Sequence, residues 1–136
     1  MKFVDTNVFV RYLTGDDPAK AAASREFFAR VERGEEAACT SEAVIAEIVY
    51  VTSSRAHHAL VRLDIVRRLQ PLLSLTGIAI PHRPTILRAL EVYAAHAQLD
   101  FEDALTVAHM ERLNIKEVLS YDRDFDAVPG VTRIEP

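Results

Sequence analysis

Two kinds of apolar spacing alternate along the chain. Short apolar runs bounded by polar or turn-forming residues predict five strands, over 2–5, 37–40, 77–80, 117–121 and 131–134. The longer segments between them carry apolar residues at helical spacing. Because strands that alternate with helices are typical of βα units, the pattern predicts an α/β fold with a mainly parallel sheet.

Capping residues mark where the helices begin and end. Asp17 followed by Pro18 predicts the start of a helix that Gly34 would end. Ser41 predicts the start of the next helix, and Pro71 is expected to end or kink the one after it. The predicted helices cover 18–33, 42–53, 58–70, 84–98 and, after an Asp100 cap, 101–114, and a short helix capped by Thr6 or Asn7 follows the first strand.

Composition narrows the class of protein. With 136 residues, the chain fits one domain over 1–136. It is 49% hydrophobic and 26% charged and has no apolar stretch long enough to cross a bilayer, which excludes a membrane-spanning protein. Because Met1 and Lys2 lead directly into a strand without the features of a secretory signal, we expect a cytoplasmic location.

The sequence lacks the residues that several kinds of functional site require. Cys39 is the only cysteine, which excludes an internal disulfide and leaves a thiolate metal site without partners. The four glycines form no phosphate-binding loop, and the five histidines show no metal-ligand spacing. A net charge of −4 argues against a protein that coats nucleic acid with a broad basic surface, although an enzyme that grips phosphates locally remains compatible with it.

Acidic residues stand where predicted strands end or helices begin. Asp5 follows the first strand and Asp122 the fourth, with Asp124 close by; Asp103 lies with Asp100 at a helix start. Ligands of open α/β sheets collect outside the carboxyl ends of the strands. Each acid has an ordinary structural explanation, a helix cap or an Asp turn, that is at least as probable by itself. Their shared position at one sheet edge favours a common site.

Glu47 is placed differently from the other acids. It lies three residues after Val44 and four before Val51, within the apolar stripe of its predicted helix. A buried carboxylate needs a compensating partner, and either an arginine or a metal ion would serve. Oxygen ligands from several carboxylates suit Mg²⁺ or Mn²⁺, which can activate water for phosphodiester hydrolysis.

Four segments together resemble a known family. They are FVDTNV at 3–8, SEAVIAEIVYV at 41–51, DFEDAL at 100–105 and LSYDRDF at 119–125. In this order they resemble the motifs of PIN-domain ribonucleases, and the length and helical middle look most like the VapC toxins of type II toxin–antitoxin systems. The resemblance covers nearly the whole chain.

The resemblance implies a fold and a site. The fold would be a three-layer α/β/α sandwich around a mainly parallel five-stranded sheet. Carried over by motif, the catalytic acids are Asp5, Glu47, Asp103 and Asp122. Of these, Asp5 and Asp103 would bind Mg²⁺ or Mn²⁺ directly, with Glu47, Asp122 and a second carboxylate at Asp124 in support; Asp103 is preferred to Asp100 because Ala104 and Leu105 follow it. Thr6 and Ser120 match supporting hydroxyl positions.

The leading hypothesis is a metal-dependent endoribonuclease toxin. Its implied partners are an RNA substrate, for example a tRNA or another structured RNA, a VapB-type antitoxin and a second copy of the chain. Arg11 and the segment from Arg55 to Arg68, Arg55 foremost, are candidates for holding RNA phosphates, although a solvated helix face is the commoner explanation for most of those charges. Two alternatives stay open: a non-catalytic PIN-like module that holds a partner peptide, and, ranked lower, an Asp-dependent phosphatase.

Overall fold

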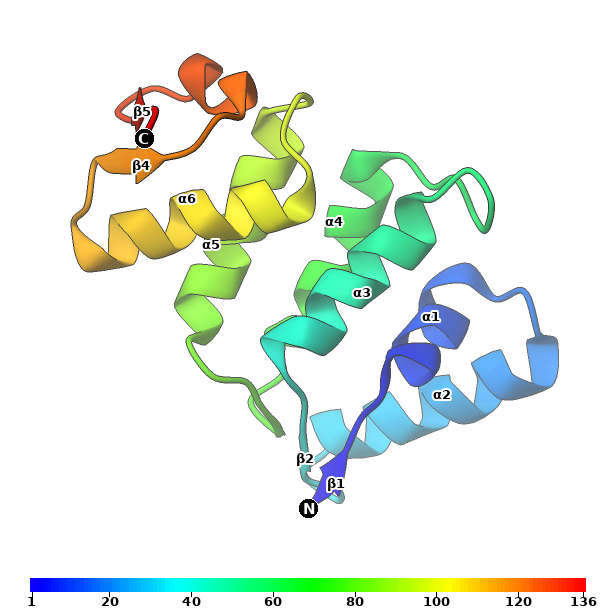
Figure 1. Cartoon of the computed structure of the whole chain (residues 1–136). Coiled ribbons are helices and arrows are strands. Elements are labelled where there is room, and N and C mark those ends of the chain that lie inside the picture. The colour runs from blue at the N-terminus through cyan, green and yellow to red at the C-terminus, as the bar shows by residue number, and fades with distance from the viewer. The chain divides into compact units, whose positions relative to one another are not determined.

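The computed structural model describes residues 1–136 as helices joined to short parallel strands (Figure 1). The chain forms two compact units, Met1–Arg83 and Pro84–Pro136, and each is described by itself. The expectation of one domain over 1–136 stays a prediction. No helix combines the length and the apolar character needed to cross a membrane.

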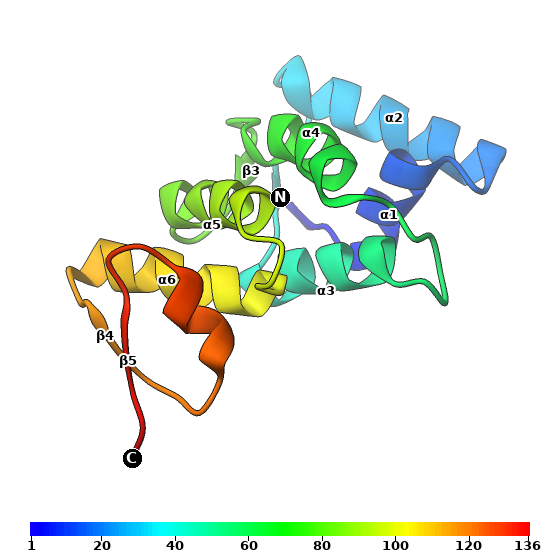
Figure 2. The ribbon, with the colours of Figure 1, turned by 90° about the horizontal axis from the view of Figure 1, so that it is seen from above.

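The first unit contains a three-stranded parallel sheet and four helices. The strands lie in the order β1 (Lys2–Phe3), β2 (Ala38–Cys39) and β3 (Ile78–Ala79), with Phe3 opposite Cys39 and Cys39 opposite Ala79. The helices are α1 (Thr6–Thr14), α2 (Pro18–Glu32), α3 (Glu42–Ser53) and α4 (Arg62–Leu73). Helix α1 lies between α2 and α3 and contacts both (Figure 2).

Local capping explains where these helices begin. The Asp17 carboxylate accepts a hydrogen bond from the Lys20 amide, and the Ser41 hydroxyl accepts one from the Val44 amide. Gly15 ends α1 in the left-handed conformation at φ 65°, where a side chain would be strained. The buried faces then meet in a core that includes Phe9, Phe28, Ile45, Ile48, Ile65, Leu69 and Ile78.

Two predictions for α4 are wrong. The helix begins at Arg62 rather than 58, and it continues through Pro71 to Leu73. Proline inside a helix costs about 3 kcal/mol. Leu72 and Leu73, which follow it, are buried, and burying each leucine contributes roughly 1.5–3 kcal/mol. Their burial is sufficient to offset the cost of the proline.

The second unit contains the remaining helices and a two-stranded parallel sheet. Its elements are most of α5 (Arg83–Ala95), α6 (Phe101–Leu113), β4 (Glu117–Leu119), the 3₁₀ helix η1 (Arg123–Ala127) and β5 (Thr132–Ile134). Val118 lies opposite Arg133 in the β4–β5 pair. Tyr93 of α5 packs edge-on against Phe101 of α6, with ring centroids 5.8 Å apart. Asn114 ends α6 at φ 55°.

All five predicted strands are present, and every strand pair is parallel. The α/β class is therefore confirmed. The expected single five-stranded sheet differs from the observed pairing, which gives a three-stranded and a two-stranded sheet. The strands have only two or three residues each, and such short apolar runs do not specify which strands pair.

Candidate metal centre

Asp5 lies where β1 passes into α1. It occupies the N-cap position of α1 in an extended conformation, yet its side chain makes no capping hydrogen bond. The structural explanation of Asp5 as a helix cap therefore does not describe its carboxylate, which is exposed to solvent. The backbone before it is fixed, because the Val4 amide donates to the Cys39 carbonyl at 2.8 Å.

Thr6 links the start of α1 to Glu47 on α3. Its buried hydroxyl donates a hydrogen bond of 3.0 Å to Oε2 of Glu47. The expectation that Thr6 or Asn7 caps α1 is wrong, because α1 begins at Thr6 with Asp5 as its N-cap residue. The Thr6 hydroxyl instead orients a carboxylate beside the end of β1.

Glu47 is more exposed than its sequence position suggested. The buried face of α3 is formed by Ile45, Ile48, Val49 and Thr52, and Glu47 lies outside it. The prediction of a core-facing carboxylate is therefore wrong: Val44 and Val51, which defined the stripe, are themselves only half-buried. Glu47 bonds to Thr6 and makes no ion pair with an arginine.

In the second unit, two neighbouring acids divide their roles at the start of α6. The Asp100 carboxylate caps the helix by accepting a hydrogen bond of 2.8 Å from the Asp103 amide. Glu102 is exposed, while Asp103 is half-buried. This is the arrangement expected from the sequence, and it leaves the Asp103 carboxylate available to a ligand.

The surroundings of Asp103 disfavour its charge. Burial, followed by the nearby carboxylates of Asp100 and Asp122, raises the pKa of its carboxyl to about 6. A carboxylate with this environment gains more than an ordinary surface acid from a nearby cation. The electrostatic surroundings of Asp103 therefore favour a bound cation.

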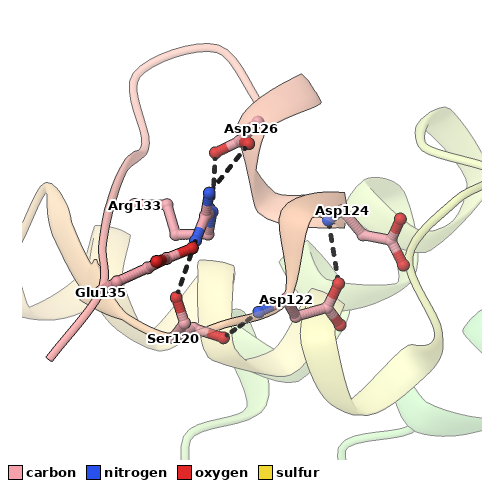
Figure 3. A network of polar contacts seen from close by, with 6 residues as sticks. All are labelled: Ser120, Asp122, Asp124, Asp126, Arg133 and Glu135. Atoms are coloured by element: carbon pink, nitrogen blue, oxygen red, sulfur yellow. Dashed lines mark hydrogen bonds and ion pairs between the residues drawn. The ribbon is translucent and has the colours of Figure 1, made fainter.

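Asp122 and Asp124 are oriented by a short turn after β4 (Figure 3). The Asp122 amide donates to the Ser120 hydroxyl at 3.0 Å, and Asp122 Oδ1 accepts from the Asp124 amide at 2.9 Å. The Asp turn expected as the structural explanation is therefore present. It engages Oδ1 of Asp122 and leaves the second oxygen of that carboxylate outside the turn.

Three of these carboxylates converge. One oxygen each from Asp103, Asp122 and Asp124 lies within 4.8 Å of the others. The donors are oxygen atoms only, which suits Mg²⁺ or Mn²⁺ rather than zinc or copper. A divalent cation would also offset the repulsion that raises the pKa of Asp103. The residues present thus fit a divalent cation.

The predicted acids therefore form two groups, one in each unit. Asp5, Thr6 and Glu47 lie together in the first unit through the end of β1 and the Thr6–Glu47 bond. Asp103, Asp122 and Asp124 converge in the second, with Ser120 bonded to Asp122. Each group combines carboxylates with the hydroxyl that the motifs predicted beside them.

A family model for the PIN domain matches residues 2–131, almost the entire chain. The chain belongs to the PIN-domain family. This confirms the family, and with it the fold, predicted from the four motifs.

Two known proteins are similar to this PIN domain. A VapC ribonuclease from Aquifex aeolicus (strain VF5) is 29% identical over 136 residues, covering 100% of this chain and 97% of the relative. Among solved structures, Mycobacterium tuberculosis VapC20, described as a sarcin–ricin loop cleaving toxin, aligns with a TM-score of 0.42 at 22% identity and covers 100% of both chains.

The two arginines predicted to hold RNA differ in their surroundings. Arg11 of the PIN domain donates to both oxygens of Asp16, at 2.9 and 2.8 Å. This pairing holds the pKa of Asp16 below its usual value and engages Nη1 of the Arg11 guanidinium. Arg55 lies exposed in the turn after α3. A role in RNA binding stays a prediction for both.

Two residues beside the acids were missed from the sequence. Thr40, buried after β2, donates from its hydroxyl to the Val4 carbonyl at 3.0 Å, next to Asp5. Arg133 on β5 donates to the Ser120 carbonyl at 3.1 Å and pairs with Asp126 and Glu135, on the side away from the Asp122 and Asp124 carboxylates (Figure 3). A polar residue at the end of a predicted strand was the signal that could have found Thr40; nothing local indicated Arg133.

Proposed function

We propose that this PIN domain is a divalent-cation-dependent endoribonuclease and the toxin of a VapBC-type toxin–antitoxin module. The observation that carries the proposal is the convergence of the Asp103, Asp122 and Asp124 oxygens within 4.8 Å. The end-to-end similarity to a VapC ribonuclease supports RNA as the substrate.

The proposed roles follow the motifs and the local geometry. Asp5 and Asp103 are the proposed direct ligands of Mg²⁺ or Mn²⁺, supported by Glu47, Asp122 and Asp124. The bound ion would lower the pKa of an attacking water and stabilise the charge that develops on the phosphate oxygens. Thr6 would hold the Glu47 carboxylate in position through its 3.0 Å bond.

The hydrogen bonds around Asp122 suggest how its carboxylate is aimed. The Ser120 hydroxyl accepts a hydrogen bond from the Asp122 amide, and Arg133 donates one to the Ser120 carbonyl. These contacts fix the chain before Asp122, and the turn to the Asp124 amide fixes the side chain itself. Such preorganisation reduces the rearrangement needed when a cation binds.

RNA cleavage by substituted proteins tests the proposal. Asp5→Asn and Asp103→Asn should each lower the cleavage rate at least a hundredfold in Mg²⁺, and chelation should abolish cleavage by the wild type. Glu102→Gln is the matched control, because Glu102 is an exposed acid in the same helical turn as Asp103. Cleavage that is equal in all variants and survives chelation would overturn the metal-dependent reaction.

The partners implied by the module can be tested separately. We expect the toxin to act on RNA in the cytoplasm, to form a homodimer, and to bind a VapB-type antitoxin encoded beside it. Co-expression with the product of the adjacent open reading frame should restore growth and yield a stable complex. If Asp5→Asn leaves toxicity unchanged while the complex persists, the chain acts as a binding module instead of a nuclease.

A further inference from the structure

A basic pocket lies in the first unit. It has a volume of about 410 Å³ and is lined by Tyr12, Leu13, Arg25, Arg67, Arg68 and Pro71. These residues come from the last turns of α1, from α2 and from α4, and both of the other helices contact α1 (Figure 2). We refer to it as the arginine pocket.

The cations of this pocket lack acidic partners. Elsewhere, Arg11 pairs with Asp16 and Arg88 with Glu91 and Glu111. Arg25 and Arg67, in contrast, are exposed and form no ion pair. Arg68 donates to the Leu13 carbonyl at 2.9 Å, which is a contact with backbone. Three guanidinium groups thus share one pocket with no carboxylate to neutralise them.

The geometry favours an anion with several oxygens. A guanidinium presents up to five N–H donors in a planar fork that matches phosphate oxygens. The carbonyl ends of α1 would repel an anion, but the Arg68–Leu13 bond covers one of them. Arg25 and Arg67 keep all their donors free for a ligand. A phosphate is the anion whose charge and oxygens match such a group.

The proposed substrate needs a contact of this kind. The acids of the second unit repel RNA, and the whole chain carries a net charge of −4. Affinity for RNA comes largely from cations that neutralise phosphates. Helix α1 begins directly after Asp5 and reaches the arginine pocket at Tyr12, seven residues later, a span of about 10 Å along the helix axis. Neighbouring nucleotides of one strand can cover such a span.

We propose that Arg25, Arg67 and Arg68 form a site for the backbone phosphates of the RNA substrate, outside the nucleotide that is cut. The inference rests on the proposed function, because it takes RNA as the ligand. The site contributes affinity and leaves the reacting groups unchanged. The site also provides the first unit with a contact to a polyanion. Arg11, which was predicted to hold RNA, is paired with Asp16 and does not supply that contact.

RNA binding in the presence of a chelator tests the inference without cleavage. The variant combines Arg25→Gln with Arg67→Gln and keeps Arg68, whose bond to Leu13 also supports the fold. The control is Arg33→Gln, which removes one positive charge next to α2 from an arginine already paired with Glu26 and Glu35. A fluorescent single-stranded RNA is titrated with the full-length wild-type, variant and control proteins at several salt concentrations.

Each phosphate contact contributes a slope of about −0.7 to log K against log salt for single strands. The double variant should therefore show a slope less steep by about 1.4, with affinity at low salt reduced at least tenfold. The control should match the wild type. A slope and affinity for the double variant equal to those of the control, or no RNA binding by the wild type, would overturn the inference.

A further measurement separates other occupants and the proposed function. Loss of binding to an aspartate-rich peptide, with RNA binding unchanged in the double variant, would assign the pocket to a protein partner and overturn the RNA site. If the wild type fails to cut RNA in Mg²⁺ yet shows the expected salt slopes, the nuclease proposal fails while the phosphate site stands. If the wild type cuts RNA but the double variant has the same salt slope as the control, the phosphate site fails while the nuclease proposal stands.

Discussion

Thr6 and Glu47, 41 residues apart in the chain, are joined by a hydrogen bond of 3.0 Å from the threonine hydroxyl to the glutamate Oε2. Thr6 is only 5% exposed, whereas Glu47 is exposed. The bond therefore restrains a flexible carboxylate from a rigid position at the start of α1. An exposed glutamate without it would sample several rotamers.

Replacing Thr6 by valine should reduce activity more than stability. Valine keeps the shape of threonine but lacks the donor, and a typical intramolecular hydrogen bond contributes about 0.5–1.5 kcal/mol to stability. We expect RNA cleavage to fall about tenfold, with a change in unfolding free energy near 1 kcal/mol. Thr6→Ser, which keeps the hydroxyl, should retain most of the rate. Single-turnover cleavage and thermal unfolding measure the two effects, and equal rates for both variants would contradict the positioning role.

Asp103→Asn should stabilise the metal-free protein at neutral pH. The pKa of Asp103 in the folded protein, about 6, lies above its ordinary value of 3.8. The folded state therefore holds the proton more tightly than the unfolded state, and this group lowers stability as pH rises from about 4 to 6. With allowance for solvent screening, the gain at pH 7 should be about 1 kcal/mol.

The pH dependence supplies the check on that gain. As pH falls from 7 toward 4, the Asp103 carboxyl becomes protonated in the folded protein, so most of the advantage of asparagine should disappear. Denaturant unfolding of the wild type and Asp103→Asn at pH 4 and 7, in a chelator, measures the difference. Glu102→Gln, from the same turn, should show no such pH-dependent gain. An equal difference in unfolding free energy at both pH values would show that the ionised Asp103 carboxylate does not destabilise the folded state.

Adding a divalent cation should raise the melting temperature of the wild-type protein. A ligand that binds only the folded state at a hundred times its Kd contributes about 2.7 kcal/mol. The carboxylates of Asp103, Asp122 and Asp124 are the groups available in the second unit. Asp122→Asn should therefore reduce the shift produced by Mg²⁺ or Mn²⁺, and a chelator should reverse it. Glu91→Gln is the control, because it removes an acid from an exposed ion pair with Arg88 that involves none of these carboxylates.

Arg133→Met should weaken cation binding by the acids of the second unit, although it replaces none of their carboxylates. Arg133 is 12% exposed, donates to the Ser120 carbonyl and pairs with Asp126 and Glu135. Its removal should lower stability chiefly because the part-buried Ser120 carbonyl loses its donor. We also expect weaker Mn²⁺ binding by calorimetry.

The control for Arg133→Met is Arg88→Met, which removes two ion pairs, with Glu91 and Glu111, whose shared arginine is 48% exposed. Such exposed pairs contribute about 0–1 kcal/mol. If both variants lose the same stability and bind Mn²⁺ equally well, Arg133 has no special role beside Asp122.

Local chemistry explains which elements were predictable. The bounds of α3 match the prediction over Glu42–Ser53 because Ser41 makes the capping bond that its side chain suggests. The different roles of Asp100 and Asp103 were also predictable, because Asp100 directly precedes the helix and is therefore the residue placed to cap it. These features depend on a few neighbouring residues.

Features that depend on distant contacts were harder to predict. Pro71 remains helical because Leu72 and Leu73 are held by the core, which the local sequence does not reveal. The exposure of Glu47 depends on which side of α3 meets its neighbours. Arg133 reaches Ser120 across the β4–β5 pair, and short strands do not specify their partners.

The turn at Asp122 has a consequence for how a cation would be held. With Oδ1 occupied by the Asp124 amide, Asp122 has one uncommitted oxygen to offer, and Asp100 is engaged in its cap. Carboxylates that offer one oxygen each would leave several of the ligand positions of a cation to water. A cation held in this way would exchange readily with the solvent. Protein purified through dialysis should therefore arrive largely stripped of metal, and its activity should follow the cation concentration of the assay buffer.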